Sequence, residues 1–268
     1  MIAAAHAAFV LTGTVTTLLG PLLPVLAARW SLDDARAGYF FTAQFAGSML
    51  GVALSGMLVT RFGFARAVAA GLAAMAAGVG ALGVAAWPAA LLSVAGYGIG
   101  LGITIPATNL MVADAAPQRR AEALNILNLA WGIGAVAAPP VFAWFAARGR
   151  VDGFLFSLAA SLVVAMLAQV AFTPTLPTAV PAQAPSRPAA PVLRWRSPAF
   201  LVYAALFFVY VGTENALAGW IAAFAQRLDA AAIAASTPAF FWAALLLGRA
   251  VAPLLLSRIS EAAWCRGV

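Results

Sequence analysis

Long runs without charged residues dominate the chain, and most charged residues are gathered in short segments between these runs. A transmembrane helix needs about 20 apolar residues to cross the hydrocarbon core of a bilayer. The run from residue 67 to residue 113 is about twice that length and contains Trp87-Pro88 near its middle, so it predicts two helices joined by a tight turn. The alternation with a period of two that is typical of membrane barrels is not found. The sequence therefore predicts eight transmembrane helices, near residues 6–28, 38–60, 66–86, 89–113, 121–147, 153–172, 199–225 and 237–257.

Composition places the chain among integral membrane proteins, because 64% of its residues are hydrophobic, 9% are charged and its mean hydropathy is +0.97. The first apolar run predicts a retained helix and not a secretory signal, since no positive charge precedes it and it is too long for a signal core. A single cysteine, Cys265, excludes an internal disulfide. The predicted fold class is all-α, a polytopic membrane helix bundle.

The net charge of +7 comes from arginine alone, because the sequence contains no lysine. A pI of 11.0 suggests nucleic acid as the partner of a soluble protein, but here most arginines fall between the predicted helices. With a cytoplasmic N-terminus, the inner loops contain more arginines than the outer loops, as the positive-inside rule requires. We therefore expect a multi-pass protein of the bacterial inner membrane, with a cytoplasmic N-terminus, the lipid bilayer around it and no nucleic acid partner.

A segment rich in proline and alanine separates the first six predicted helices from the last two. Repeated prolines prevent a continuous helix, so residues 173–198 predict a cytoplasmic linker. Residues 1–172 then form a six-helix transmembrane half, and residues 199–268 form a partial second half with two transmembrane helices.

The second and eighth predicted helices align with each other at a constant spacing. Gly51 pairs with Gly248, Leu58 with Leu255, and Arg61 with Arg258. A match this short also arises by chance in apolar sequence, but repeated halves of six helices are typical of secondary transporters.

The segment from Gly56 to Arg66 resembles the loop between the second and third helices of the major facilitator superfamily. Thr60 stands where that family has an acid, and Phe64 replaces an arginine. The resemblance implies that the glycines let two helices approach closely and that the charges form an inner gate. Asp114 and Arg119 follow the fourth predicted helix and form either ion pairs at the inner surface or a solvated loop. The gating residues expected from these features are Gly56, Arg61, Gly63, Arg66, Asp114 and Arg119.

Three further segments resemble the fucose permease-like sugar transporters within that superfamily: GPLLP at residues 20–24, ALNILNLAWGIGA at residues 123–135, and YVGTE at residues 210–214. The resemblance implies a complete first half of six helices and two helices of the second half. One departure concerns proton coupling, because the glutamate of the family's fourth helix falls on Ile105 when the alignment is anchored on Asn109. Proton symport through that residue is therefore not implied.

One glutamate, Glu214, lies inside an apolar stretch, where an ionised carboxylate costs roughly 2.5 to 3.5 kcal/mol. Tyr210 shares a helical face with it, and Asn125 and Asn128 share a face of the fifth predicted helix. We expect these faces to line a hydrated cavity for a hydroxylated ligand, with Glu214 accepting ligand hydrogens or exchanging a proton. The alternatives are that the asparagines join helices and that Glu214 pairs with Arg249. The expected cavity residues are Gln44, Asn109, Asn125, Asn128, Trp131, Tyr210, Glu214, Asn215 and Trp220.

No arrangement for catalysis emerges from the sequence. One histidine and one cysteine, far apart, provide neither a metal site nor a nucleophile with its base. The glycines near residue 100 follow no strand, so they do not predict a nucleotide-binding loop. We therefore expect no enzyme activity, no metal and no cofactor.

These observations predict a secondary active transporter of a small polar, sugar-like solute that works by alternating access, with a proton or another cation as the open choice of coupling ion. The second half stops after two predicted helices, so we expect the chain to be incomplete or to associate with another chain that supplies the missing helices. Two alternatives remain: a truncated, non-transporting membrane protein that acts only through helix association, and a drug or metabolite efflux carrier of the same superfamily.

Overall fold

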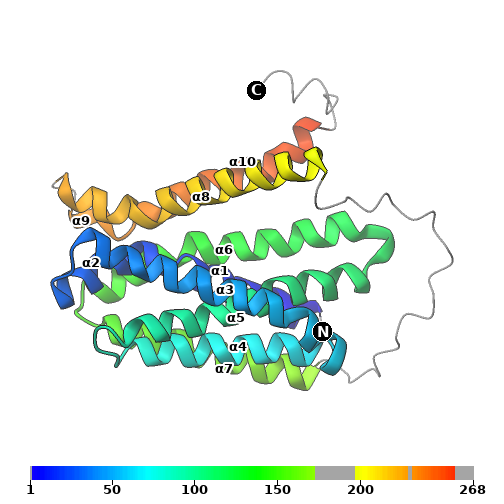
Figure 1. Ribbon diagram of the computed structural model, residues 1–268, viewed down its shortest axis with the longest axis horizontal. Helices are drawn as coiled ribbons and strands as arrows, with labels where there is room; N and C mark the ends of the chain where they lie inside the picture. Colours follow the sequence, from blue (N-terminus) through cyan, green and yellow to red (C-terminus); the bar gives the residue numbers. More distant parts are fainter. Residues whose placement is uncertain (1, 173–196, 229–230, 257–268) are drawn as a thin grey trace.

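The computed structural model describes residues 2–172, 197–228 and 231–256, and these residues are almost entirely helical (Figure 1). The all-α prediction is confirmed, and strands are absent from the part of the chain described. The elements are α1 (Ile2–Thr16), α2 (Leu19–Trp30), α3 (Asp34–Phe62), α4 (Phe64–Leu82), α5 (Ala90–Ala115), the 3-10 helix η1 (Pro117–Arg119), α6 (Arg120–Ala146), α7 (Val151–Phe172), α8 (Pro198–Arg227), α9 (Ala231–Ala234) and α10 (Thr237–Leu256).

Most predicted transmembrane helices match observed helices closely. Six helices of the described chain are long and apolar enough to cross a membrane: α3, α4, α5, α6 with η1, α7 and α8. The predicted turn at Trp87-Pro88 separates α4 from α5. The eighth predicted helix corresponds to α10, whose apolar part at Thr237–Val251 is shorter than a full crossing. Except for Ser197 and Pro198, which begin α8, the predicted linker lies outside the described residues.

The first predicted helix is not continuous, which corrects the sequence prediction for residues 6–28. It is broken into α1 and α2, which meet at an angle of 41°. Pro21 has no N–H to donate to the Thr17 carbonyl, and that carbonyl instead accepts a bond from Gly20 at 3.3 Å. The Thr17 hydroxyl donates to the Gly13 carbonyl at 3.1 Å, a local bond that bends helices.

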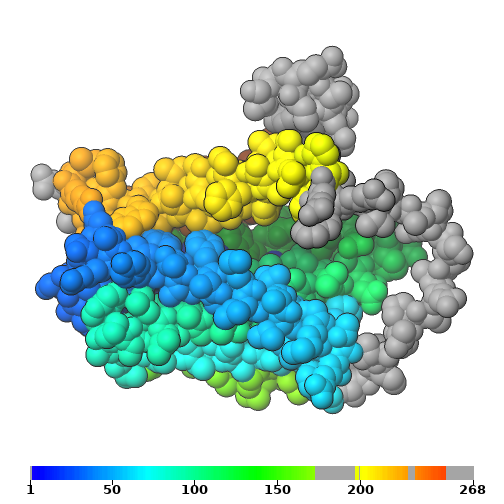
Figure 2. Space-filling view, viewed as in Figure 1, coloured from blue at the N-terminus to red at the C-terminus, as the bar shows by residue number. Residues whose placement is uncertain are grey.

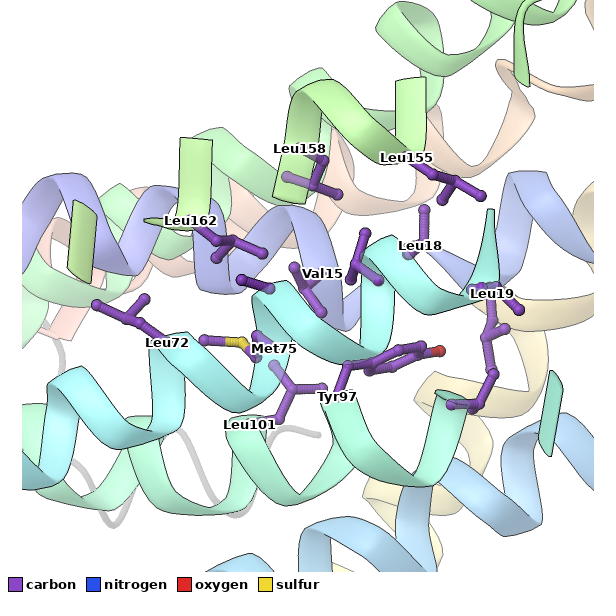
Figure 3. Close-up of a cluster of buried hydrophobic side chains, with 14 of the residues drawn as sticks. Val15, Leu18, Leu19, Leu72, Met75, Tyr97, Leu101, Leu155, Leu158 and Leu162 are labelled. Atoms are coloured by element: carbon purple, nitrogen blue, oxygen red, sulfur yellow. The ribbon is translucent and has the colours of Figure 1, made fainter. Parts of the chain in front are cut away.

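The helices α1 to α7 form one packed unit, here called the first-half bundle. Its closest neighbours are α3 with α5, α4 with α5, α4 with α7, and α1 with α6. Figure 3 shows part of its core, where side chains of α1, α2, α4, α5 and α7 meet. The residues labelled there are Val15, Leu18, Leu19, Leu72, Met75, Tyr97, Leu101, Leu155, Leu158 and Leu162.

Glycines bring α3 and α5 unusually close to each other. A Cβ added at Gly47, Gly51 or Gly102 would overlap a backbone carbonyl of the facing helix. The Ser48 hydroxyl also donates to the Gly98 carbonyl at 3.1 Å. Lipid tails provide no hydrophobic force between helices, so close packing of small residues is what stabilises such a pair.

The helices α8 and α10 pack together against one side of the first-half bundle and are here called the second-half pair (Figure 1). α8 contacts α2, and α10 contacts α6. A Cβ added at Gly20 would lie 2.7 Å from the Ala218 carbonyl oxygen, so the two backbones nearly touch. The rings of Trp131 and Trp242 meet edge to face with centroids 5.4 Å apart.

The second-half pair touches the first-half bundle at one end and separates from it toward the other. At the closed end, Arg227 of α8 pairs with Asp34 of α3 at 2.5 Å. Farther along, α8 and α3 are separated by an apolar groove of about 760 Å³, visible between the two helices in Figure 2. The groove is lined by Gly38, Phe41, Phe45 and Met49 of α3 and by Ala204, Phe207, Phe208, Val211, Gly212, Asn215, Ala216 and Trp220 of α8.

We predict that Gly102→Ala lowers the thermal midpoint, because the added methyl group would overlap the Ser48 carbonyl and overpacking costs about 1–3 kcal/mol. The matched control is Gly56→Ala, where no described atom lies within 4 Å of the added Cβ. Alanine favours a helix over glycine by about 1 kcal/mol, so this control should keep or raise the midpoint. Thermal unfolding of the purified variants in detergent measures both. A Gly102→Ala midpoint equal to that of Gly56→Ala would contradict the close packing.

We also predict that Arg227→Gln loosens the closed end and brings the other end together. Spin labels at Met49→Cys and Ala204→Cys, in a Cys265→Ser background, report the distance across the groove. The Arg227–Asp34 ion pair is exposed, so it stabilises the closed end by less than about 1 kcal/mol. In Arg227→Gln, the ratio of molecules with a short label-to-label distance to molecules with a long one should therefore rise about two- to five-fold.

The charge-swapped variant with Asp34→Arg and Arg227→Asp should restore the original distances. Arg29→Gln is the control, because Arg29 pairs with Asp152 inside the first-half bundle at 2.9 Å. An identical effect of Arg29→Gln and Arg227→Gln would show that the bridge between the two units has no specific role.

Candidate functional site

The break between α1 and α2 opens into a small polar chamber between the first-half bundle and the second-half pair. The chamber has a volume of about 10 Å³, enough for about one water molecule. Broken membrane helices place polar backbone and side-chain groups at the binding sites of many transporters. The polar residues that line the chamber are Thr16, Thr17, Gln44, Asn215 and Trp242.

Gln44 is held in the chamber by a tyrosine of the neighbouring helix. The Tyr97 hydroxyl donates to Gln44 Oε1 at 2.9 Å, and both side chains are buried. Because the amide oxygen is occupied in this way, the two N–H groups of the amide remain as donors toward the chamber.

Asn215 and Trp242 complete the set of polar groups from the second-half pair. Asn215 Nδ2 donates to the Val211 carbonyl at 2.8 Å, which leaves its oxygen as an acceptor. Trp242 Nε1 is buried and has no hydrogen-bond partner among the described residues. The residues that line the chamber therefore carry unused donors, on Gln44 and Trp242, and an unused acceptor, on Asn215, a mixed set that suits a hydroxylated molecule.

Trp131 connects the broken helix to the second-half pair. Its indole nitrogen donates to the Thr16 hydroxyl at 3.4 Å. The Thr16 hydroxyl in turn donates to the Thr12 carbonyl at 2.7 Å. On its other side, the Trp131 ring lies 5.8 Å from the guanidinium carbon of Arg249, within the range of a cation–π contact.

Glu214 lies next to Asn215 on α8 and faces a charge on α10. Its Oε2 is 3.8 Å from a guanidinium nitrogen of Arg249. This positive charge offsets the cost of an ionised carboxylate within an apolar helix. The separation is longer than a hydrogen bond, so the carboxylate keeps capacity to accept one. The Glu214 side chain is 11% exposed and that of Arg249 is 42% exposed, so the pair sits at the edge of the packed region.

Four of the predicted cavity residues meet around this region. Gln44 and Asn215 line the chamber, while Trp131 and Glu214 both lie near the guanidinium group of Arg249. Trp220 lines the apolar groove and packs on Phe41 with ring centroids 6.1 Å apart.

The other predicted cavity residues lie outside the chamber. Asn109 donates to the Ile105 carbonyl of its own helix at 2.8 Å. Asn125 and Asn128 are exposed on the face of α6 that carries Gly132, which packs against Leu246 of α10. Both asparagines belong to the first three turns of α6, and Tyr210 of α8 is exposed. Their role in binding stays a prediction.

The predicted gating loop forms the junction of α3 and α4. Gly63 ends α3 with a φ of 83°, a conformation that favours glycine. Gly56 has no described neighbour within 4 Å of an added Cβ, so its part in close helix packing stays a prediction. Arg61 lies over the Phe62 ring at 5.5 Å, and Arg66 is exposed.

An ion pair between η1 and α6 follows the end of α5. Arg119 Nε donates to Glu122 at 2.7 Å within α6 and η1. Asp114 lies in the last turn of α5, is exposed and forms no ion pair with the described residues, so its part in a gate stays a prediction.

Sequence reasoning missed several chamber residues. Thr16 and Thr17 precede Gly20 and Pro21, and that combination signals a helix break. Trp242 and Tyr97 have no comparable signal, because aromatic residues in apolar helices more often pack in a core.

Comparison with known proteins identifies the family. A family model described as the Major Facilitator Superfamily matches residues 5–266. A search of the curated proteins finds no match.

Solved structures show the same fold at low sequence identity. A D-xylose-proton symporter matches with a TM-score of 0.67 and 17% identity, over 96% of this chain and 69% of that one. A bacterial homologue of the human lysosomal transporter Spinster, inward-facing and unoccupied, matches with a TM-score of 0.67 and 18% identity, over 97% and 63%. The xylose transporter XylE from E. coli, in an inward-open conformation, matches with a TM-score of 0.54 and 16% identity, over 64% of this chain and 47% of that one. Together with the polytopic bundle, the family match shows that this chain belongs to the Major Facilitator Superfamily and is a multi-pass membrane transporter rather than an enzyme.

Proposed function

We propose that this chain carries a small polar, sugar-like solute by secondary active transport with alternating access. The observation that carries the proposal is the polar chamber beside a broken helix, which Gln44, Asn215 and Trp242 line together. Hydroxyl groups of a sugar both donate and accept hydrogen bonds, so they match this mixed set of donors and acceptors. The fold likeness to a D-xylose-proton symporter and the resemblance to fucose permease-like transporters support the same solute class.

The arrangement of the two units supports an inward-facing state. The closed end carries Asp34 and Arg227, whereas the N-terminus and the junction at Gly63 lie at the other end. With the N-terminus in the cytoplasm, as the arginine distribution predicts, the separated end faces the cytoplasm. A chamber with room for about one water is too small for a sugar, so binding requires the second-half pair to move.

Glu214 is the proposed coupling residue. Protonation would remove its attraction to Arg249 and thus change the contact between α8 and α10. In the fucose permease-like transporters the fourth helix carries a glutamate, and Ile105 takes its position here. The carboxylate of Glu214 on α8 would then take over the coupling role.

Further helices are proposed to complete the transporter. The chain spans 69% and 63% of the two structures with the higher TM-scores. The apolar groove exposes Phe45, Phe207 and Phe208, and an apolar face of this kind favours contact with another membrane helix from a partner chain.

The same groove favours a second candidate, an efflux carrier for a lipophilic drug or metabolite. Its lining is mostly aromatic and aliphatic, and its volume of about 760 Å³ is sufficient for a drug-sized molecule. The chamber and the groove share Asn215, so one carrier of this shape can take either kind of solute.

Uptake into right-side-out membrane vesicles that contain this chain tests the proposal. Labelled D-xylose and L-fucose should enter with saturable kinetics and faster under an inward proton gradient. Transport of a lipophilic dye without sugar uptake would favour the efflux carrier. No saturable flux of any tested solute would contradict both and leave a non-transporting helix bundle.

We predict that Glu214→Gln removes acceleration by the proton gradient, because the amide neither carries charge nor exchanges a proton at physiological pH. Arg249→Gln should lower the yield of folded protein, since it leaves an unpaired carboxylate in the bundle. The double variant should recover the folded yield of Glu214→Gln alone. Gradient-driven uptake at the original rate in Glu214→Gln would remove this residue from the mechanism.

A further inference from the structure

Tyr97 is buried inside the first-half bundle, but its hydroxyl is hydrogen-bonded to Gln44, a side chain that lines the polar chamber. It lies on α5 with no exposed surface, among the apolar residues of the core in Figure 3. Its hydroxyl donates to Gln44 Oε1 of α3 at 2.9 Å. A buried tyrosine hydroxyl needs a polar partner, and here that partner is a residue of the chamber.

The backbone beside this hydrogen bond is also fixed. A Cβ added at Gly98, the residue after Tyr97, would overlap the Gln44 carbonyl, so α5 and α3 are in backbone contact at this point. The Ser48 hydroxyl bonds the Gly98 carbonyl one turn along α3. Gln44 is thus held at its backbone by glycine packing and at the end of its side chain by a hydroxyl.

A glutamine amide has two different ends, one oxygen that accepts and one nitrogen that donates. A half-turn of the amide exchanges them at almost no steric cost, so packing alone does not decide which end faces the chamber. Gln44 Oε1 is the acceptor of the Tyr97 hydroxyl, which is fully buried. If the amide were reversed, the hydroxyl would have to accept from the nitrogen and its own hydrogen would lose this acceptor, so the observed orientation, with the nitrogen left for the chamber, is favoured.

We propose that Tyr97 is a positioning residue that orients the Gln44 amide, so that the chamber presents N–H donors at this point to an acceptor oxygen of the solute. The link to transport rests on the proposed function, whereas the orientation of the amide does not. The alternative role for Tyr97 is core packing alone, which phenylalanine would fulfil equally well.

The orientation is tested without any solute by nuclear magnetic resonance of the full chain with ¹⁵N-labelled glutamine side chains. The Gln44 signal is assigned by its loss in Gln44→Ala. Tyr97→Phe should move this signal, because the amide oxygen loses its hydrogen bond and the amide is no longer held in one orientation. Tyr39→Phe, the same change at a tyrosine that is 53% exposed, is the matched control and should leave the signal unchanged. An unchanged Gln44 signal in Tyr97→Phe would overturn the proposal.

The consequence for the solute is tested by D-xylose uptake. Tyr97→Phe should raise the half-saturation concentration about three- to ten-fold and leave the maximal rate unchanged. Gln44→Met, which removes the amide and keeps the hydroxyl, should raise it at least as much, and Tyr97→Phe should add nothing in that background. Equal half-saturation in Tyr97→Phe and the unmodified chain, with an altered Gln44 signal, would overturn the solute contact. If the unmodified chain moves no sugar, the proposed function fails, and the resonance experiment still decides the positioning role.

Discussion

A bilayer contains no water to satisfy polar groups, and this constraint decides both the fold of the chain and the location of its polar side chains. Backbone groups are satisfied inside helices, so the described chain is a bundle of them. Side chains such as Gln44, Asn215 and Glu214 need partners from other helices or from water, and the structure gathers them where the second-half pair meets the first-half bundle. The candidate site is therefore the region where apolar packing is interrupted.

The two units differ in how firmly they are held. Glycine contacts between α3 and α5, together with the Ser48 and Tyr97 hydrogen bonds, fix the wall of the chamber that Gln44 forms. The second-half pair instead touches the first-half bundle at one end, through Ala218 against Gly20 of α2 and Arg227 against Asp34 of α3, and separates from it farther along. A rigid wall opposite a lightly attached pair of helices is the arrangement that a rocking transporter requires.

The sequence predicted the helices well because each long apolar run has one stable form in lipid, and it found Glu214 because a charge in such a run is costly. It missed the break at Thr17, since hydropathy does not register lost backbone hydrogen bonds. Helical periodicity groups Asn128 with Gly132, which contacts α10, but Asn128 itself does not line the chamber. Periodicity shows which side of a helix a residue is on and not how far along the neighbouring helix it lies. Tyr97 and Trp242 are recognised only from their neighbours, which are remote in the sequence.

The most direct test of the account is whether the Glu214 side of α8 faces water. A spin label at Tyr210→Cys in a Cys265→Ser background is compared with one at Val164→Cys on α7, a side chain that is 65% exposed on an outer helix. We predict that the label at position 210 collides more often with a water-soluble nickel chelate and the label at 164 with oxygen dissolved in lipid. Preference for oxygen at both positions would place Tyr210 against lipid and contradict a hydrated cavity between the two units.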